Sequence, residues 1–121
     1  MNVDNVKSQM RKGMLEYCIL LLLHRGASYA SDIIQDLKEA KLIVVEGTLY
    51  PLLTRLKNDE LLSYKWVEST QGPPRKYYCL TEKGEDFLSE LQMAWDELSG
   101  TVNHLRTNLL ISKNYEEDSN S

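Results

Sequence analysis

The segment from residue 47 to residue 84 constrains the fold of this 121-residue chain more than any other part of it. Residues 47–56 place four leucines on one face at helical spacing, so they form a helix with an apolar side. Residues 61–68 then alternate as a strand does, residues 69–74 are rich in turn formers, and residues 76–80 return as a second strand. The sequence therefore predicts a helix followed directly by a two-stranded hairpin.

The polar residues of this segment have the chemistry of a DNA-binding surface. An α-helix fits the major groove of duplex DNA, and a basic hairpin beside it can reach the phosphates. We expect the two cations at the hairpin tip to contact DNA, with solvated turn residues as the alternative. Tyr50 could instead be a partly buried ring that steadies the helix. The candidate DNA contacts so far are Thr48, Tyr50, Pro51, Arg55, Arg75 and Lys76.

Two further helices precede this segment. Apolar residues from Met10 to Arg25 recur at helical spacing and are numerous enough for burial on more than one side, so this helix also belongs at a subunit interface. Gly26 ends it, and Ser28 is the expected N-cap of a second helix that ends near Lys41. Pro51 is expected in the first turn of the third helix, where a missing N–H costs nothing. The predicted fold class is mainly α with a small β-hairpin.

The last third of the chain carries an unbroken heptad pattern. Its members step alternately by three and four residues, as they do in a helix that pairs with another helix. A domain this small needs only part of such a helix to close its own core, so the remainder predicts a dimer interface. The alternative is a long helix that folds back on its own domain. The predicted interface residues are Leu88, Leu91, Trp95, Leu98, Val102, Leu105 and Leu109.

Trp95 lies in the middle of this heptad pattern. In a symmetric dimer it would meet its own copy across the two-fold axis, and the two indoles could bind a planar aromatic ligand by stacking. Asp96 and Tyr17 complete this candidate ligand site. The alternative is that Trp95 is a packed core aromatic.

The net charge of the whole chain argues against nucleic-acid binding, but the distribution of that charge along the chain does not. The chain carries −4 overall, but residues 85–121 hold eight acidic and two basic side chains, a net of −6. Residues 1–84 therefore carry +2, and the acidity lies away from the predicted DNA-binding segment.

Composition and motifs argue against several other classes of protein. The longest apolar run, residues 18–23, is far shorter than the roughly 20 residues of a membrane span, and the N-terminus lacks a signal-peptide pattern, so we expect a cytoplasmic protein. The two cysteines are expected to be reduced. His24 and His104 lie on different helices, without Cys or carboxylate clusters beside them. No metal, no cofactor and no enzymatic activity are predicted.

Two motifs in this chain resemble the PadR family of bacterial transcriptional regulators. Residues 47–56 read GTLYPLLTRL, which is similar to the family's recognition helix, and residues 72–84 read GPPRKYYCLTEKG, which is similar to its wing and the following helix start. The resemblance covers roughly residues 10–105 and adds Tyr29, ahead of the second helix, to the candidate DNA contacts. One departure is Glu60, where the family usually has a glycine at the helix exit.

The resemblance implies three regions. Residues 1–84 would form a winged helix-turn-helix whose first helix also contributes to the dimer, residues 85–113 a dimerisation helix, and residues 114–121 a disordered acidic tail. A single C-terminal helix is similar to the short subfamily, whose multidrug-sensing members have a tryptophan at the dimer centre, where Trp95 falls. The function expected is a homodimeric repressor that reads a pseudo-palindromic DNA operator and is released by a planar aromatic effector. A protein-binding winged helix and an aromatic-ligand-binding dimer without a DNA function are the alternatives.

Overall fold

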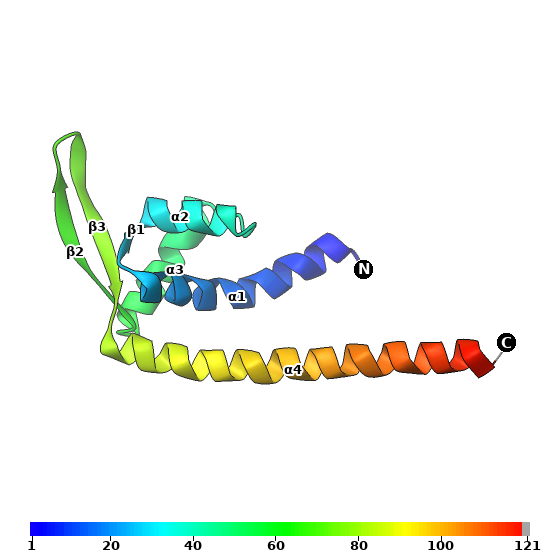
Figure 1. Ribbon diagram of the computed structural model, residues 1–121. Coiled ribbons are helices and arrows are strands. Elements are labelled where there is room, and N and C mark those ends of the chain that lie inside the picture. The colour runs from blue at the N-terminus through cyan, green and yellow to red at the C-terminus, as the bar shows by residue number, and fades with distance from the viewer. Residues whose placement is uncertain (120–121) are drawn as a thin grey trace. The chain divides into compact units, whose positions relative to one another are not determined.

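The computed structural model describes the backbone of residues 1–119 and the side chains of residues 1–107 (Figure 1). The chain divides into two compact units, Met1–Leu88 and Ser89–Ser121. No helix among the described residues is long and apolar enough to cross a membrane. In chain order the elements are α1 (Val3–Arg25), β1 (Ser28–Tyr29), α2 (Ala30–Glu39), α3 (Glu46–Asn58), β2 (Leu62–Ser69), β3 (Gly72–Leu80) and α4 (Glu82–Ser119).

The core of the first unit is made of aliphatic side chains from every helix and from the root of the hairpin. Each fully buried side chain of this size contributes about 1.5–3 kcal/mol relative to exposure. No polar or charged residue of the described side chains is buried with them. The nine most buried large side chains are Ile19, Leu20, Ile33, Leu37, Leu49, Leu53, Leu56, Leu62 and Leu88.

The hairpin is part of a three-stranded antiparallel sheet with the order β1-β3-β2. In its register Tyr64 lies opposite Tyr78, and Trp66 lies opposite Lys76. The predicted hairpin is confirmed, but the sequence missed β1, which pairs with β3 through only two residues. A strand of two residues is too short to show a period of its own, so only the partner strand reveals it.

The exit of α3 places Glu60 in the left-handed region of backbone conformation, with φ 65°. The amide of Leu61 donates to the carbonyl of Leu56 at 3.0 Å, and the amide of Glu60 donates to the carbonyl of Lys57 at 2.9 Å. This is the Schellman arrangement that usually has glycine at the left-handed position. Glu60 therefore occupies the left-handed position at which the family usually has glycine, and this exit leads the chain directly into β2.

The start of α4 is hydrogen-bonded to the same exit. Thr81 caps this helix: its Oγ1 accepts from the amide of Gly84 at 2.9 Å and donates to the carbonyl of Glu60 at 2.7 Å. The amide of Thr81 donates to the carbonyl of Leu61 at 3.1 Å. A Cβ atom on residue 84 would overlap the Leu61 carbonyl oxygen, so only glycine allows the backbone to approach this closely.

Three boundaries differ from the sequence predictions. Pro51 lies inside α3, beyond its first turn, because the helix starts at Glu46. Tyr29 and not Ser28 is the N-cap of α2, and its amide donates to Asp32 Oδ2 at 3.2 Å. The third is the end of α4, which reaches Ser119 and not residue 113, and so extends through most of the segment expected to be a disordered tail. The rest of that tail lies outside the described residues.

Candidate nucleic-acid interface

The side of α3 opposite its buried leucines is polar and exposed. Thr48, Tyr50, Pro51 and Arg55 all lie on it, as the helical spacing predicted. Because Leu49, Leu53 and Leu56 are buried in the core of the first unit, the position of this polar surface is fixed by packing. Its hydroxyl and guanidinium groups can donate to base edges and to phosphates.

Arg55 has a protein partner in this structure. Its Nη2 lies 3.1 Å from Glu16 Oε1 of α1, while the arginine side chain stays 66% exposed. An ion pair this exposed contributes little to stability, so Arg55 can exchange Glu16 for another anion at small cost.

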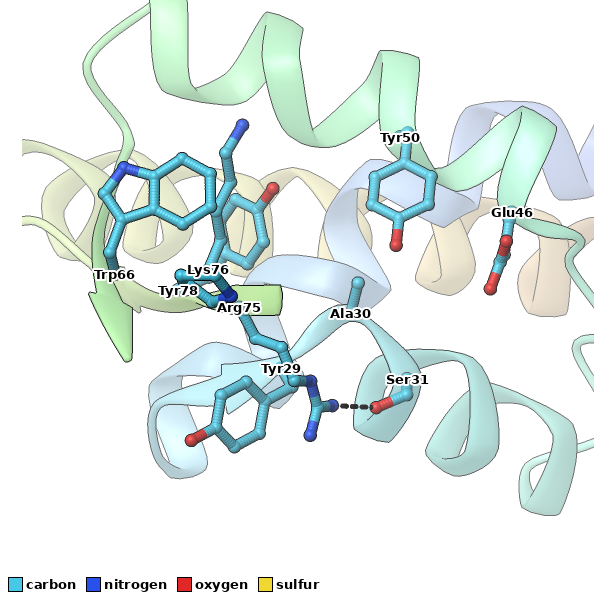
Figure 2. Close-up of a pocket in the computed structure, with 10 residues that line it drawn as sticks. Tyr29, Ala30, Ser31, Glu46, Tyr50, Trp66, Arg75, Lys76 and Tyr78 are labelled. Carbon is cyan, nitrogen blue, oxygen red and sulfur yellow. Dashed lines mark hydrogen bonds between the residues drawn. The ribbon is translucent and has the colours of Figure 1, made fainter. Parts of the chain in front are cut away.

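A hollow with a volume of about 410 Å³ lies among the starts of α2 and α3 and the hairpin (Figure 2). It brings together four of the predicted contact residues, which are Tyr29, Tyr50, Arg75 and Lys76. Pro51 and Arg55 line a separate, more open hollow along α3, which also includes Tyr50. Tyr50 thus joins the two hollows. An exposure of 45% fits both the predicted DNA contact and the alternative of a partly buried ring that steadies the helix.

The hairpin tip differs from the prediction. Thr70 and Gln71 form the turn, while Arg75 and Lys76 lie within β3. The two prolines before Arg75 belong to the strand, which begins at Gly72, so the turn is shorter than the sequence indicated. The cations are therefore set back along the hairpin from its tip.

Adjacent residues of a strand point to opposite faces, and the two cations obey this rule. Arg75 Nη2 donates to Ser31 Oγ at 2.5 Å, and its guanidinium carbon lies 3.9 Å from the centre of the Tyr29 ring. Lys76 Nζ lies 4.6 Å from the ring centre of Tyr64 and 5.4 Å from that of Trp66. Figure 2 shows Arg75 directed toward α2 and Lys76 directed away from it.

The hollow is also lined by residues that the sequence hypothesis left out. Trp66 is 61% exposed, and Ser31 and Glu46 lie at the starts of α2 and α3. The signal for Trp66 was present in the sequence, because strand alternation puts it on the same face as Tyr64. No comparable signal existed for Ser31, since its proximity depends on the pairing of β1 with β3.

Tyr78 forms the buried floor of this hollow. Burial, and then the neighbouring phenols of Tyr50 and Tyr64, raise the pKa of Tyr78 above its usual 10.0. Tyr78 therefore keeps its proton at physiological pH and remains a neutral hydroxyl. The described residues contain no group of three His, Cys, Asp or Glu side chains that could hold a metal ion.

The predicted interface residues of α4 separate into two groups. Leu88 is only 2% exposed and fills the core of the first unit, so its assignment to a dimer interface is wrong: about two turns of the helix are needed to close the domain. Leu91 is half-buried, and Leu109 lies outside the residues whose side chains are described. The others are exposed in the single chain: Trp95 by 43%, Leu98 by 63%, Val102 by 52% and Leu105 by 62%.

The remaining candidate ligand residues belong to different units of the chain. Tyr17 is half-buried on α1 of the first unit, and Asp96 is exposed on α4 in the second.

Comparison with known proteins places this arrangement in a family. A family described as the transcriptional regulator PadR-like family matches residues 19–90. A PadR-like transcription factor from Bacteroides fragilis is 80% identical, with a TM-score of 0.73 over 84% of this chain and 98% of that one. A PadR family regulator from Eggerthella lenta is 31% identical, with a TM-score of 0.79 over 85% of this chain and 90% of that one.

A curated sequence is also related. An uncharacterized protein from Lysinibacillus sphaericus is 30% identical over 100 residues, which are 80% of this chain and 92% of that protein. The proteins matched by family and by structure are transcriptional regulators and not enzymes. From the family match over most of the first unit and the structural likeness, it follows that this chain belongs to the PadR-like family of transcriptional regulators.

Proposed function

We propose that this chain is a homodimeric, DNA-binding repressor that reads a pseudo-palindromic operator in the cytoplasm. In this proposal α3 enters the major groove, and the hairpin of β2 and β3, called the wing from this point, lies against the adjoining backbone. Two copies related by a two-fold axis would read half-sites about one helical turn apart. The observation that carries the proposal is the exposed polar side of α3, which adjoins the hollow lined by Lys76.

Charge supports the assignment of this surface to DNA. Residues 1–84 carry +2, although the whole chain carries −4. Arg55 borders the α3 hollow, and Lys76 lies on the wing face that carries Tyr64 and Trp66. Cations grouped beside a helix of groove size release condensed counterions when they meet phosphates, and this release supplies much of the affinity for DNA.

The exposed apolar residues of α4 support the homodimer. Leu98, Val102 and Leu105 are more than half exposed and recur at the spacing of a two-helix contact. Each square ångström of such surface removed from water contributes about 25 cal/mol, so association with a second copy would stabilise the chain.

A planar aromatic effector is the regulatory part of the proposal. Trp95 belongs to the same heptad row, and its exposure in the single chain is 43%. In the proposed dimer the two copies of Trp95 would face each other, and a planar ligand could stack between them with Asp96 nearby. Ligand binding at this position would bias the separation of the two DNA-binding units and so release the operator.

The test is a binding titration with labelled DNA from upstream of the chain's own gene, at two salt concentrations. We expect tight binding that weakens steeply as salt increases, because phosphate contacts release counterions. Changing Tyr50 and Arg55 together to Ala should abolish operator preference. The matched control changes Lys38, an exposed residue near the end of α2, to Ala and should bind normally.

Two results would direct attention to other functions. Absence of binding to both operator and random DNA would contradict the DNA-binding proposal and favour a protein partner for the same surface. Binding of planar dyes in the absence of any DNA affinity would instead favour an aromatic-ligand-binding dimer.

A further inference from the structure

We propose that the two wing cations have different roles, an inference that rests on the DNA-binding function proposed above. Lys76 contacts the DNA phosphate, and Arg75 is a positioning residue that holds the wing against the start of α2. The sequence hypothesis treated the two residues as an equivalent pair at the tip. Their positions in β3 and their different partners separate them.

Arg75 is fixed from two directions. Its Nη2 donates to Ser31 Oγ at 2.5 Å, and its guanidinium carbon lies 3.9 Å above the centre of the Tyr29 ring. Both partners belong to the junction between β1 and α2, because Tyr29 is the last residue of the strand and Ser31 lies in the first turn of the helix. Because its guanidinium is both stacked on and hydrogen-bonded to this junction, Arg75 connects the wing to the helices. We call this contact of Arg75 with Tyr29 and Ser31 the strut.

The strut adds to an attachment that is otherwise small, because β1 is a short strand. This strand holds β3 through only two pairs, Ser28 with Tyr78 and Tyr29 with Tyr77. The rings of Tyr29 and Tyr77 add a contact, with centres 4.9 Å apart. Arg75 lies two residues further toward the tip than Tyr77, so its contact with Ser31 extends the attachment beyond the last strand pair.

Lys76 has a different environment on the opposite face. Its ammonium group lies over the rings of Tyr64 and Trp66, and no ion pair of Lys76 forms among the residues that the structure describes. Aromatic faces hold a cation in place without neutralising it. The charge of Lys76 is therefore available to a phosphate that approaches the hollow, whereas Arg75 would first have to leave Ser31 and Tyr29.

The first experiment measures the operator dissociation constant as a function of salt for Arg75→Ala and Lys76→Ala. Each phosphate contact contributes about 0.9 to the slope of log K against log salt. We expect Lys76→Ala to lower that slope by about 0.9 for each subunit, because a phosphate contact is lost. Arg75→Ala should weaken binding severalfold and leave the slope unchanged. A slope lowered equally by the two substitutions would overturn the proposal.

The second experiment separates position from charge with Arg75→Lys and Ser31→Ala. Lysine keeps the charge but lacks the planar fork that stacks on Tyr29 and bonds Ser31. We expect Arg75→Lys to bind DNA as weakly as Arg75→Ala. Ser31→Ala, which changes no charge, should reproduce part of that loss and should not add to it in the double variant with Arg75→Ala. Wild-type affinity in Arg75→Lys would contradict a positioning role.

The third measurement needs no DNA and remains decisive if the proposed function is wrong. Hydrogen exchange of the amides at Ser28, Tyr29, Tyr77 and Tyr78 reports the attachment of the wing to β1. We expect faster exchange there in Arg75→Ala and Ser31→Ala, and wild-type exchange in Lys76→Ala. Failure of the wild-type chain to bind DNA would contradict the function alone. Unchanged exchange in Arg75→Ala would contradict the strut alone.

Discussion

The two units of this chain differ in where their apolar side chains lie. In the first unit the large aliphatic residues of α1, α2 and α3 are buried, and Leu88 of α4 closes that core. In the second unit Leu98, Val102 and Leu105 remain exposed at similar spacing on the same helix. The same residue types and the same heptad rule thus produce a completed core in one unit and an incomplete surface in the other. The completed unit supplies a stable platform, and the incomplete one offers the surface on which the proposed second copy would pack.

The largest expected effect is the loss of the proposed dimer. Changing Leu98 and Leu105 together to Lys places two charges on the exposed apolar row, so we expect monomers or aggregate in sedimentation experiments. The matched control changes Asn103 and Thr107, which lie outside the heptad row, to Lys and should remain dimeric. An intact dimer in the Leu98 and Leu105 variant would show that the second unit does not depend on this row.

The next effect acts on the junction that closes the first unit. Gly84→Ala would push a methyl group into the backbone oxygen of Leu61, and we expect a loss of about 3 kcal/mol in the free energy of unfolding by urea titration. Gly100→Ala is the matched control, since a Cβ there meets nothing within 4 Å. In a helix interior that control should gain about 0.5–1 kcal/mol. Equal effects of the two substitutions would contradict the tight contact at the junction.

A smaller effect concerns the strained exit of α3. Glu60→Gly should raise the free energy of unfolding by about 1 kcal/mol, because glycine adopts positive φ without the steric cost that other residues bear. The substitution also removes the exposed pair between Glu60 and Lys83, whose atoms are 3.6 Å apart and which contributes little. Glu60→Ala controls for this loss and should show no gain. Equal stability of the glycine and alanine variants would mean that the exit is unstrained.

The smallest effect is a pH dependence of the first unit. Burial raises the pKa of the Cys18 thiol above its usual 9.0. As pH rises, the thiol ionises first in the unfolded chain, so the stability from its burial is complete below that value and is lost as pH rises through the folded pKa. Urea midpoints measured from about pH 8 to pH 10 should fall more steeply for the wild type than for Cys18→Ala. Parallel profiles would show that the Cys18 thiol contributes nothing to this loss.

The sequence predicted those features of the fold that depend on local pattern. Leucine spacing located α3, and alternation located the hairpin. Features that depend on distant pairing were missed. β1 exists only because β3 lies beside it, and the burial of Leu88 depends on how much of α4 the first unit needs.

The candidate site was predicted less completely than the fold, for the same reason. Residue type indicated that Tyr50, Arg55, Arg75 and Lys76 could contact DNA, and the structure places all four around the hollows of the first unit. Residue type could not show that Arg75 and Lys76 lie on opposite faces, because that depends on where the turn falls. The sequence placed the turn at residues 69–74, whereas the strand already begins at Gly72.

The alternation of β3 has a consequence for how wings of this kind can evolve. The face of β3 on which Arg75 and Lys76 lie depends on their distance in sequence from Tyr77 and Tyr78, which pair with β1. It does not depend on their distance from the turn residues Thr70 and Gln71 at the tip. Residues can therefore be gained or lost at the tip without exchanging the two roles. A single insertion between Lys76 and Tyr77 would exchange the faces of Arg75 and Lys76, so Arg75 would point toward the DNA and no longer toward α2. The length of the wing can thus change during evolution, whereas the number of residues between the two cations and Tyr77 cannot.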